Sequence, residues 1–371
     1  MSKIDLHIIS FDIPYPANYG GVIDVFYKLK TLHELGYKIS LHCFEYGRAR
    51  AEELKMYCSQ INYYDRSMGL TNQLSAMPYI VKSRKNPKLI DNLLKDTAPI
   101  LFEGLHTCAY LQDERINSRK KIVRMHNVEH KYYSGLKLAE LNPLKRVYFQ
   151  IESNKLKNYE SILNSANSVL CISQSDLNYY SKIVPYAALL KPFVENQGEI
   201  PSVKLQDYCL YHGNLEVAEN QNSLRFLMDV FKGSTIKLIV AGKNPSKVIK
   251  KEIQISSNIE LIENPNNEKL IELIAQAKVS CLPTFQSTGI KLKLINSLIN
   301  GNVVVVNNQM VEGTELGKYC LKANTKSEWR KTLVDVFSKN IDLLSIQERR
   351  VEVSKMFDNK ENIKPLLVLL A

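Results

Sequence analysis

The stretch from residue 279 to residue 306 limits the possible folds of this chain more than any other part of it. It begins with a short apolar run, passes through a polar loop that contains Gly289, and continues with apolar residues at helical spacing. Four consecutive valines close it, and a continuous β-branched run is typical of a strand buried on both faces of a parallel sheet. The stretch therefore predicts strand, glycine loop, helix and strand, with Gly301 ending the helix.

The start of this predicted helix, near Ile290, is a candidate phosphate site. The first backbone N–H groups of a helix have no partner within it, and the helix dipole favours negative charge there. Lys291 and Lys293 add positive charge in the first turn. The alternative is a glycine turn that binds nothing, because a lone glycine followed by lysine is a weak signal. These residues alone leave both interpretations open.

Strand-like and helix-like segments alternate along the whole chain, which predicts parallel sheets with crossover helices. A length of 371 residues favours two domains. The alternation is interrupted between residues 184 and 206, so we predict the domain boundary there. We expect a first domain over residues 1–186, a second over 187–345, and C-terminal helices over 346–371 that cross back to the first domain.

The expected strands follow from short apolar, β-branched runs. In the first domain they cover residues 4–10, 39–44, 61–64, 100–103, 122–125 and 169–172. In the second domain they cover residues 209–212, 236–241, 259–262, 279–282, 303–306 and 319–321. We expect helices between them, including a long one over 144–163 and two C-terminal helices separated near Asp358.

Composition narrows the class of protein. With 45% hydrophobic and 23% charged residues the chain is typical of globular proteins, and no apolar run is long enough for a transmembrane helix. The first residues predict a strand and not a signal peptide. The seven cysteines show no metal-binding spacing, so we expect them to be reduced core residues of a cytoplasmic protein.

The net charge of +11 favours anionic partners. No nucleic-acid-binding motif is present, so we expect no nucleic acid partner. The basic segment 82–88 could meet a membrane surface or an acidic ligand, or it could be a solvated loop. The basic first domain would suit a lipid-linked or anionic acceptor at the inner membrane face.

Two further loops contain candidate site residues. Gly20 and Gly21 precede a predicted helix, where the absence of side chains lets a ligand approach the backbone. His126 directly follows a predicted strand, at the edge where open α/β sheets place their ligands, and is a candidate for catalysis or substrate contact. Asn127 could cap the next helix. His126 and His130 have a metal-like spacing, but no third ligand is evident, and we expect no metal.

Taken together, these segments resemble the GT-B glycosyltransferases, in particular the large retaining group called family 4. The resemblance covers almost the whole chain. It rests on YPANYGG before a helix, RMHNVE after a strand, LYHGNLEVAENQNSLRFL at the start of the second domain, IVAGKNP, and STGIKLKLINSLINGNVVVVN followed by Glu312 and Gly313. It implies an α/β fold with two Rossmann-like, doubly wound parallel-sheet domains that face a cleft.

The resemblance also implies a function. It implies transfer of a hexosyl-type sugar from a UDP- or GDP-linked donor to a glycan or lipid-linked acceptor, with retention, in envelope polysaccharide biosynthesis. Helix N-termini and basic side chains would stabilise the leaving diphosphate without a metal or other cofactor. His126 would face the transferred sugar. The implied donor-binding residues are Gly20, Gly21, Gly213, Asn214, Lys243, Thr288, Gly289, Ile290, Lys291, Lys293 and Asn296.

The chain departs from the family pattern at two places. Family members carry two glutamates eight positions apart across the glycine loop, and the aligned residues here are Thr288 and Asn296. The basic pair that usually follows the first strand of the second domain is replaced by Asn214 and Asn220. Lysines elsewhere could supply the missing charge, and the candidates are Lys243, Lys291 and Lys293.

These departures leave a second class of function open. A non-catalytic GT-B protein would bind a glycan or a partner enzyme without turnover. A sugar-nucleotide epimerase of the same fold is a third interpretation, although the acid and base that it needs cannot be picked out of the sequence.

Overall fold

The chain folds into alternating strands and helices, as the sequence predicts. The computed structural model describes residues 4–140, 142–195, 204–286 and 289–371. The N-terminal strands are β1 (Leu6–Ser10), β2 (Ile39–Glu45), β3 (Gln60–Asp65), β4 (Ile100–Glu103), β5 (Lys121–Met125), β6 (Ser168–Cys171) and β7 (Ala187–Leu189). The later strands are β8 (Gln206–Asn214), β9 (Lys237–Lys243), β10 (Ile259–Glu263), β11 (Ala277–Leu282), β12 (Val303–Val306) and β13 (Leu321–Lys322).

The helices fill the connections between these strands. Those up to the second sheet are α1 (Gly20–Glu34), α2 (Tyr79–Lys82), α3 (Pro87–Leu93), α4 (Glu129–Ala139), α5 (Pro143–Tyr159) and α6 (Gln174–Tyr180). The remaining helices are α7 (Ala218–Phe231), α8 (Lys247–Gln254), α9 (Asn267–Gln276), α10 (Leu292–Asn300), α11 (Asn308–Val311), α12 (Lys326–Phe337), α13 (Leu343–Met356), α14 (Asn359–Asn362) and α15 (Lys364–Leu370).

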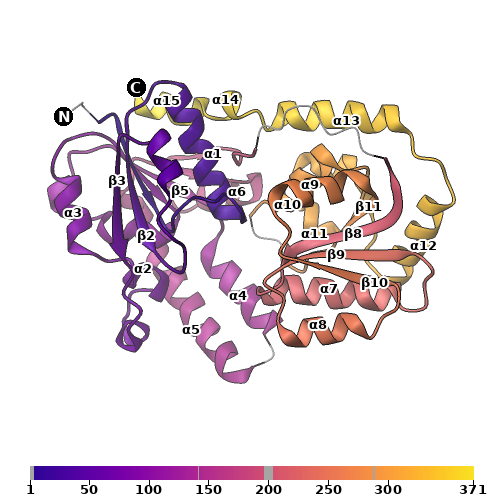
Figure 1. Ribbon diagram of the computed structural model, residues 1–371. Helices are drawn as coiled ribbons and strands as arrows, with labels where there is room; N and C mark the ends of the chain where they lie inside the picture. The colour runs from indigo at the N-terminus through magenta and orange to yellow at the C-terminus, as the bar shows by residue number, and fades with distance from the viewer. Residues whose placement is uncertain (1–3, 141, 196–203, 287–288) are drawn as a thin grey trace.

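Two parallel sheets organise these elements, and Figure 1 shows them side by side. The first has the strand order β3-β2-β1-β4-β5-β6-β7, and the second has the order β10-β9-β8-β11-β12-β13. In each sheet the order reverses beside its first strand, β1 or β8, which is the doubly wound arrangement. The predicted fold class is therefore confirmed. We call the first sheet with α1–α6 the N-terminal unit, and the second sheet with α7–α13 the C-terminal unit.

Three of the four valines of β12 are buried as the sequence predicts, and Val303 is half-buried. Val304, Val305 and Val306 are fully buried, and β12 pairs in parallel with β11 on one side and β13 on the other. α10 covers the sheet here with Leu294 and Leu298, which belong to the same core cluster as Val304 and Val306. The strand, loop, helix and strand order over residues 279–306 therefore forms one continuous part of the C-terminal core.

Several predicted boundaries need correction. β7 was missed because it is only three residues long and half-buried at the edge of the sheet. The helix expected over 144–163 ends at Tyr159 and continues as a short 3-10 helix over Glu160–Ser165. The C-terminal segment forms three helices, and Asp358 caps the middle one by accepting the Glu361 N–H. Val128, and not Asn127, occupies the N-cap position of α4.

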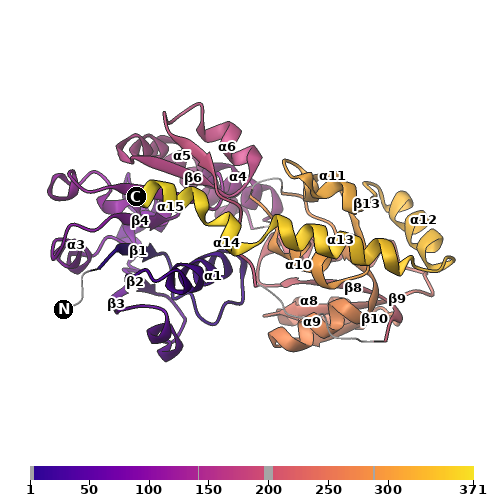
Figure 2. The same ribbon diagram turned by 90° about the horizontal axis from the view of Figure 1, so that it is seen from above.

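The C-terminal helices return to the N-terminal unit. α13 runs along the C-terminal unit, and α14 and α15 lie against the N-terminal unit near α1 (Figures 1 and 2). Ile363 and Leu366 are fully buried in the core that contains β1 and α1. Asn359 also holds the connection between the two sheets: its Oδ1 accepts the Val194 N–H at 3.1 Å, and its Nδ2 donates to the Val194 carbonyl at 2.7 Å. None of the helices in the described residues is both long and apolar enough to span a bilayer.

The paired hydrogen bonds of Asn359 lead to a stability prediction. Asn359→Ala leaves the buried N–H and C=O of Val194 unpaired, and each unpaired group costs about 1–3 kcal/mol. We expect the free energy of unfolding, measured by urea denaturation, to fall by about 2–4 kcal/mol. Asn362→Ala in the same short helix is the matched control, because the Asn362 side-chain nitrogen has no hydrogen-bond partner. An equal loss in both variants would contradict this account.

Candidate functional site

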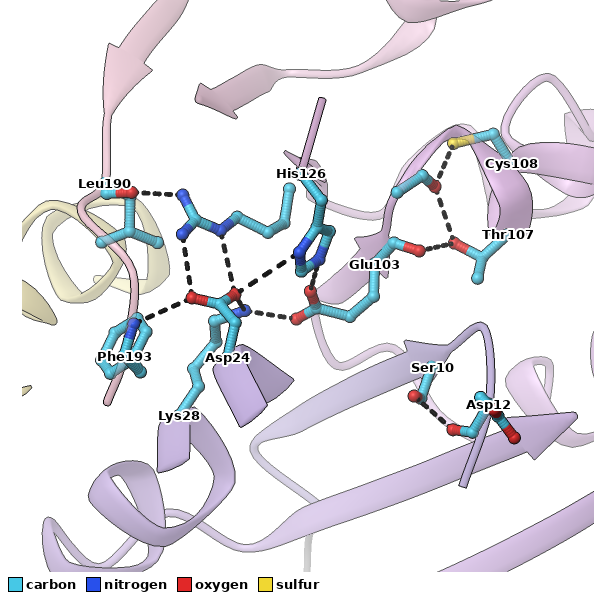
Figure 3. A network of polar contacts seen from close by, with 12 residues as sticks. Ser10, Asp12, Asp24, Lys28, Glu103, Thr107, Cys108, His126, Leu190 and Phe193 are labelled. Atoms are coloured by element: carbon cyan, nitrogen blue, oxygen red, sulfur yellow. Dashed lines mark hydrogen bonds and ion pairs between the residues drawn. The ribbon is translucent and has the colours of Figure 1, made fainter. Parts of the chain in front are cut away.

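A group of buried ionisable side chains meets at the carboxyl end of the first sheet (Figure 3). They come from α1, from the end of β4 and from the end of β5, and they are Asp24, Lys28, Glu103, Arg124 and His126. The first four are fully buried, and His126 is 9% exposed. Buried charges are very unfavourable unless they are paired and hydrogen-bonded. The contacts within this group show how the pairing is achieved.

Lys28 joins the two carboxylates. Its Nζ lies 3.0 Å from Asp24 Oδ2 and 2.7 Å from Glu103 Oε1. Arg124 holds the other side of Asp24, with its Nη2 3.1 Å from Oδ1. Burial acts to raise the pKa of both carboxyls, but Arg124 and Lys28 outweigh it at Asp24, and Lys28 and His126 outweigh it at Glu103, so both pKa values are lowered. Two anions and two cations therefore balance each other in this network.

The same network holds the segment that leads to the second sheet. The Phe193 N–H donates to Asp24 Oδ1 at 2.9 Å, and Figure 3 shows this bond beside the Lys28 contact. The Arg124 guanidinium donates to the Leu190 carbonyl and, at 3.3 Å, to the Lys191 carbonyl. Leu190, Lys191 and Phe193 lie between β7 and β8. Asp24 and Arg124 therefore hold this connecting segment next to His126.

His126 lies at the carboxyl end of β5, where the sequence predicts it. Its Nε2 is 2.9 Å from Glu103 Oε2, and because a carboxylate only accepts, Nε2 carries the proton. The Phe11 ring packs edge-on against the imidazole, with the ring centroids 5.4 Å apart. Nδ1 is buried without a hydrogen-bond partner in the described residues, and it lies 3.9 Å from Asp24 Oδ2. Nδ1 is therefore the ring atom that remains to accept a hydrogen bond from a ligand.

A metal ion does not fit this network. Asp24, Glu103 and His126 offer ligand atoms that lie within 4.8 Å of one another. However, the Lys28 ammonium already lies between the two carboxylates, so a divalent cation would meet a positive charge there. His130, the other candidate ligand in the sequence, bonds Glu160 through its Nδ1 at 2.9 Å instead.

The two glycines before α1 have different surroundings. A Cβ added at Gly21 would lie 2.5 Å from Phe11 Cζ, whereas a Cβ at Gly20 would meet nothing within 4 Å. Gly21 therefore allows α1 to approach the ring that packs on His126, and Gly20 leaves the start of α1 open.

The expected residues of the C-terminal unit lie at the carboxyl ends of its strands. Gly213 and Asn214 end β8 and pair in register with Gly242 and Lys243 of β9. A cavity of about 760 Å³ separates this edge from the loops after β1 and β2. Arg48 of the N-terminal unit also lines it, and burial followed by the charge of Arg48 lowers the pKa of Lys243.

The start of α10 brings positive charge to the same edge. The helix begins at Leu292, slightly later than predicted, with Lys291 at the N-cap. Lys293 Nζ lies 3.1 Å from Asn220 Oδ1 and 5.2 Å from the ring centroid of Tyr211. Asn220 stands where the resemblance expects a basic residue, so Lys293 places an ammonium group beside that position. Burial lowers the pKa of Lys291 to about 8, and Glu219 partly opposes the shift.

Thr288 and Asn296 are the residues aligned with the two family glutamates, and the structure describes only the second. Thr288 lies outside the described residues. Asn296 lies on α10, and its Oδ1 accepts a hydrogen bond from Asn300 Nδ2 at 2.6 Å. A ribose contact by this oxygen would therefore compete with a bond inside the helix.

Gly289 lies at the junction between the two units. Its φ is +65°, and an added Cβ would lie 2.3 Å from Asn127 Oδ1 and 2.9 Å from the His126 carbonyl. The Gly289 N–H donates to the Asp176 carboxylate at the start of α6. The amide that the sequence assigns to a phosphate thus has a carboxylate partner from the N-terminal unit. Gln286 adds a second contact, because its Nε2 donates to the Tyr132 carbonyl at 3.2 Å.

Several residues of the site were missed from the sequence. Asp24 and Lys28 lie within a mainly apolar helix face, and a charge in such a face is the signal that could have identified them. Arg124 was identified only as part of the polar segment 124–130, without its partners. Glu103 and Asp176 each lie at the carboxyl edge of the first sheet but carry no local signal of their own.

Comparison with known proteins places this site in context. No family model matches the chain. A curated relative, described as an uncharacterized 44.6 kDa protein in the cps region of Klebsiella pneumoniae, is 28% identical over 359 residues, covering 90% of this chain and 91% of the relative.

Solved structures resemble the chain over its whole length at low sequence identity. Sucrose-phosphate synthase from Thermosynechococcus elongatus has a TM-score of 0.73 at 12% identity, covering 99% of this chain and 98% of that one. TarM has a TM-score of 0.72 at 11% identity, covering 100% and 99%. Anabaena HepE, solved with UDP and glucose, has a TM-score of 0.69 at 11% identity, covering 99% of each chain. The chain therefore has the GT-B fold.

The different surroundings of the two glycines before α1 can be tested directly. Alanine is favoured over glycine inside a helix by about 0.5–1 kcal/mol, so Gly20→Ala should leave the thermal midpoint unchanged or slightly raised. Gly21→Ala forces the Phe11 ring to move and should lower stability by about 1–2 kcal/mol. Circular dichroism melting of the two variants checks this. Equal midpoints for the two variants would show that Gly21 does not hold this contact.

A second prediction concerns Glu129, the first residue of α4. Burial, and then the charge of Asp176, raises the pKa of Glu129 from 4.5 to about 8. The folded state therefore binds this proton more tightly than the unfolded state. The stability from this group is fully present below pH 4.5 and is lost as the pH rises toward about 8.

Glu129→Gln removes this titration and should therefore flatten the decline in thermal midpoint between about pH 5 and about pH 9. Glu114→Gln, at an exposed position, is the matched control and should keep the decline of the wild type. If Glu129→Gln and the wild type decline equally, Glu129 is not protonated in the folded state.

Proposed function

We propose that this protein is a glycosyltransferase that moves a hexosyl-type sugar from a UDP- or GDP-linked donor to a glycan or lipid-linked acceptor, with retention. The GT-B fold supports the proposal, because the solved structures that share it include sucrose-phosphate synthase and a complex with UDP and glucose. The observation that carries it is the position of Lys291 and Lys293 at the start of α10, on the edge that faces the N-terminal unit.

Two partly buried lysines at a helix N-terminus favour an anionic ligand. Burial lowers the pKa of both ammonium groups, and the charge of Glu219 opposes the shift at each. A diphosphate would bring negative charge to the two lysines and would also accept hydrogen bonds from backbone N–H groups of the first turn. Lys293 would act beside Asn220 in place of the basic residue that the sequence lacks.

The reaction requires stabilisation of the leaving group more than it requires a nucleophile. As the bond between sugar and phosphate breaks, negative charge develops on the diphosphate, and fixed positive groups aimed at it lower the barrier. A retaining mechanism of this kind needs no protein nucleophile. His126 Nδ1 would accept a hydrogen bond from a hydroxyl of the transferred sugar. Glu103 would hold the imidazole ring in that orientation through its contact with Nε2. His126 is thus the residue that we assign to substrate contact at the reacting sugar.

We propose that the reaction is independent of a metal ion. Lys28 occupies the space between the carboxylates of the Asp24, Glu103 and His126 group, and Lys291 and Lys293 offer a different neutralisation of the diphosphate. The proposed setting is cytoplasmic, peripheral at the inner membrane face, in the assembly of an envelope polysaccharide. The cps-region relative and the net charge of +11, which favours anionic surfaces, support this setting.

A non-catalytic GT-B protein is the second candidate. The observation that favours it is Asn296, which stands where family members carry a glutamate and is engaged by Asn300. A measurement of turnover distinguishes the transferase from the non-catalytic protein. Release of UDP or GDP from a sugar nucleotide, lost in His126→Ala, supports the transferase. Nucleotide-independent glycan binding with no turnover supports the alternative.

A thermal-shift screen identifies the donor. UDP, GDP and their sugar conjugates are each tested with and without EDTA, and a ligand at a hundred times its Kd should stabilise the protein by about 2.7 kcal/mol. We expect one nucleotide base to stabilise the chain, with no effect of EDTA. Loss of the shift in EDTA would contradict metal independence, and no shift with any nucleotide would contradict the donor site.

The lysines at α10 give the prediction that is most specific to this chain. Lys293→Met removes a partly buried charge that faces the proposed diphosphate, so we expect nucleotide affinity to fall at least tenfold, or about 1.4 kcal/mol. Lys331→Met, at an exposed position on α12, is the matched control and should bind like the wild type. Isothermal titration calorimetry measures both. Unchanged affinity in Lys293→Met would remove the central support for the diphosphate site.

A further inference from the structure

The cavity of about 760 Å³ between the two units contains one cation from each of them. Arg48 lies in the loop after β2, and Lys243 is the last residue of β9. Both side chains are half-buried and line the cavity. Because they come from opposite sides, the two cations could hold a ligand between the units.

The hydrogen-bond partners of Arg48 are neutral groups. Its Nη1 donates to Asn18 Oδ1 at 2.9 Å, its Nη2 donates to the Pro16 carbonyl, and its guanidinium lies 5.4 Å from the ring centroid of Tyr19. Its Nε is buried without a hydrogen-bond partner among the described residues. A guanidinium is always charged, so these contacts fix its position and leave its charge without a paired anion.

The Lys243 ammonium is in a similar position. It forms no hydrogen bond or ion pair with the part of the chain that the structure describes. Burial, followed by the charge of Arg48, lowers the pKa of Lys243, and the charge of Glu216 only partly opposes this shift. Two cations that repel each other in a partly buried cavity favour an anion between them.

Three carboxylates also line the cavity, but none of them forms an ion pair with either cation within the described residues. Asp12 accepts a hydrogen bond from the Tyr19 hydroxyl at 2.7 Å. Glu216 accepts one from Asn244 Nδ2 at 3.3 Å, and Glu53 is exposed. The carboxylates therefore have other surroundings, and the two cations remain available to a ligand.

The cavity adjoins the proposed donor site on two sides. Asn214 lines it, and the Asn214 carbonyl accepts a hydrogen bond from Asn220 Nδ2 at 2.9 Å, while Asn220 Oδ1 lies 3.1 Å from Lys293 Nζ. On the other side, the Phe11 ring packs on His126, and the next residue in the chain lines the cavity. A ligand in the cavity would thus lie beside both the proposed diphosphate and the proposed contact with the transferred sugar, where an acceptor is required.

We infer that the acceptor is an anionic sugar, and that Arg48 and Lys243 bind its phosphate or carboxylate group. Both cations form strong, charge-assisted hydrogen bonds with either kind of anion. The rings of Tyr15, Tyr19 and Tyr46 line the same cavity and offer apolar surface to a sugar. The inference rests on the proposed function, because it takes the ligand of the cavity to be the acceptor. It also gives Lys243 an acceptor role in place of the donor role that the family resemblance implies.

The experiment compares three sugars that differ only at carbon 6. Thermal-shift titrations at constant ionic strength measure Kd for glucose, glucose 6-phosphate and glucuronate, with UDP or GDP at saturation to occupy the start of α10. We expect at least one anionic sugar to bind the wild type at least tenfold more tightly than glucose. Arg48→Met and Lys243→Met should each weaken that sugar about tenfold and change the Kd of the nucleotide less than about twofold. The preferred anion distinguishes a phosphate-bearing acceptor from a carboxylate-bearing one.

Arg50→Met is the matched control. Arg50 also lines the cavity, but its Nε and Nη2 pair with the two oxygens of Glu45 at 2.8 and 2.9 Å, so this variant should bind the anionic sugar like the wild type. Equal binding of all three sugars, or anionic binding that both Met variants retain, overturns the inference and leaves the proposed function intact. A loss of nucleotide affinity as large as the loss of sugar affinity also overturns it, because the two cations would then serve the diphosphate. Binding of neither nucleotide by the wild type overturns the proposed function, and the inference with it.

Discussion

The buried ion network around Asp24 is the interaction on which the arrangement of the molecule depends. One carboxylate contacts Lys28 of its own helix, Arg124 of β5 and the Phe193 N–H of the segment between the sheets. Loss of one partner from a buried network leaves an uncompensated charge, which costs about 3–5 kcal/mol. The network therefore couples three features energetically. They are the position of α1 on the first sheet, the orientation of His126 through Glu103, and the path of the chain to the second sheet.

The two units contribute opposite charges to their junction. The N-terminal unit places Asp176 there, and the C-terminal unit places Lys291 and Lys293 at the start of α10. The bond from Gln286 Nε2 to the Tyr132 carbonyl is one contact across this junction. A sugar nucleotide carries both an anionic diphosphate and hydroxyl groups, so the fold and the charges support the same proposed function.

The sequence predicts the fold well where periodicity dominates. The strand at 303–306 and the helix after Gly289 can be predicted from the sequence, because β-branched runs and helical spacing of apolar residues indicate which residues are buried. β7 could not be predicted, because three half-buried residues at a sheet edge carry no pattern. The site was predicted only in part. Strand ends and glycine turns identify the residues of its loops, such as His126 and Gly289. The ion network depends on residues 24, 103 and 124 meeting in space, and the bond from Gly289 to Asp176 depends on how the two units dock.

The most direct test of the account is a crystal structure of the chain with the sugar nucleotide that stabilises it most. The account predicts the diphosphate at the first turn of α10, in contact with Lys293, and the transferred sugar in contact with His126. A nucleotide bound away from α10, or a sugar that does not contact His126, would contradict it.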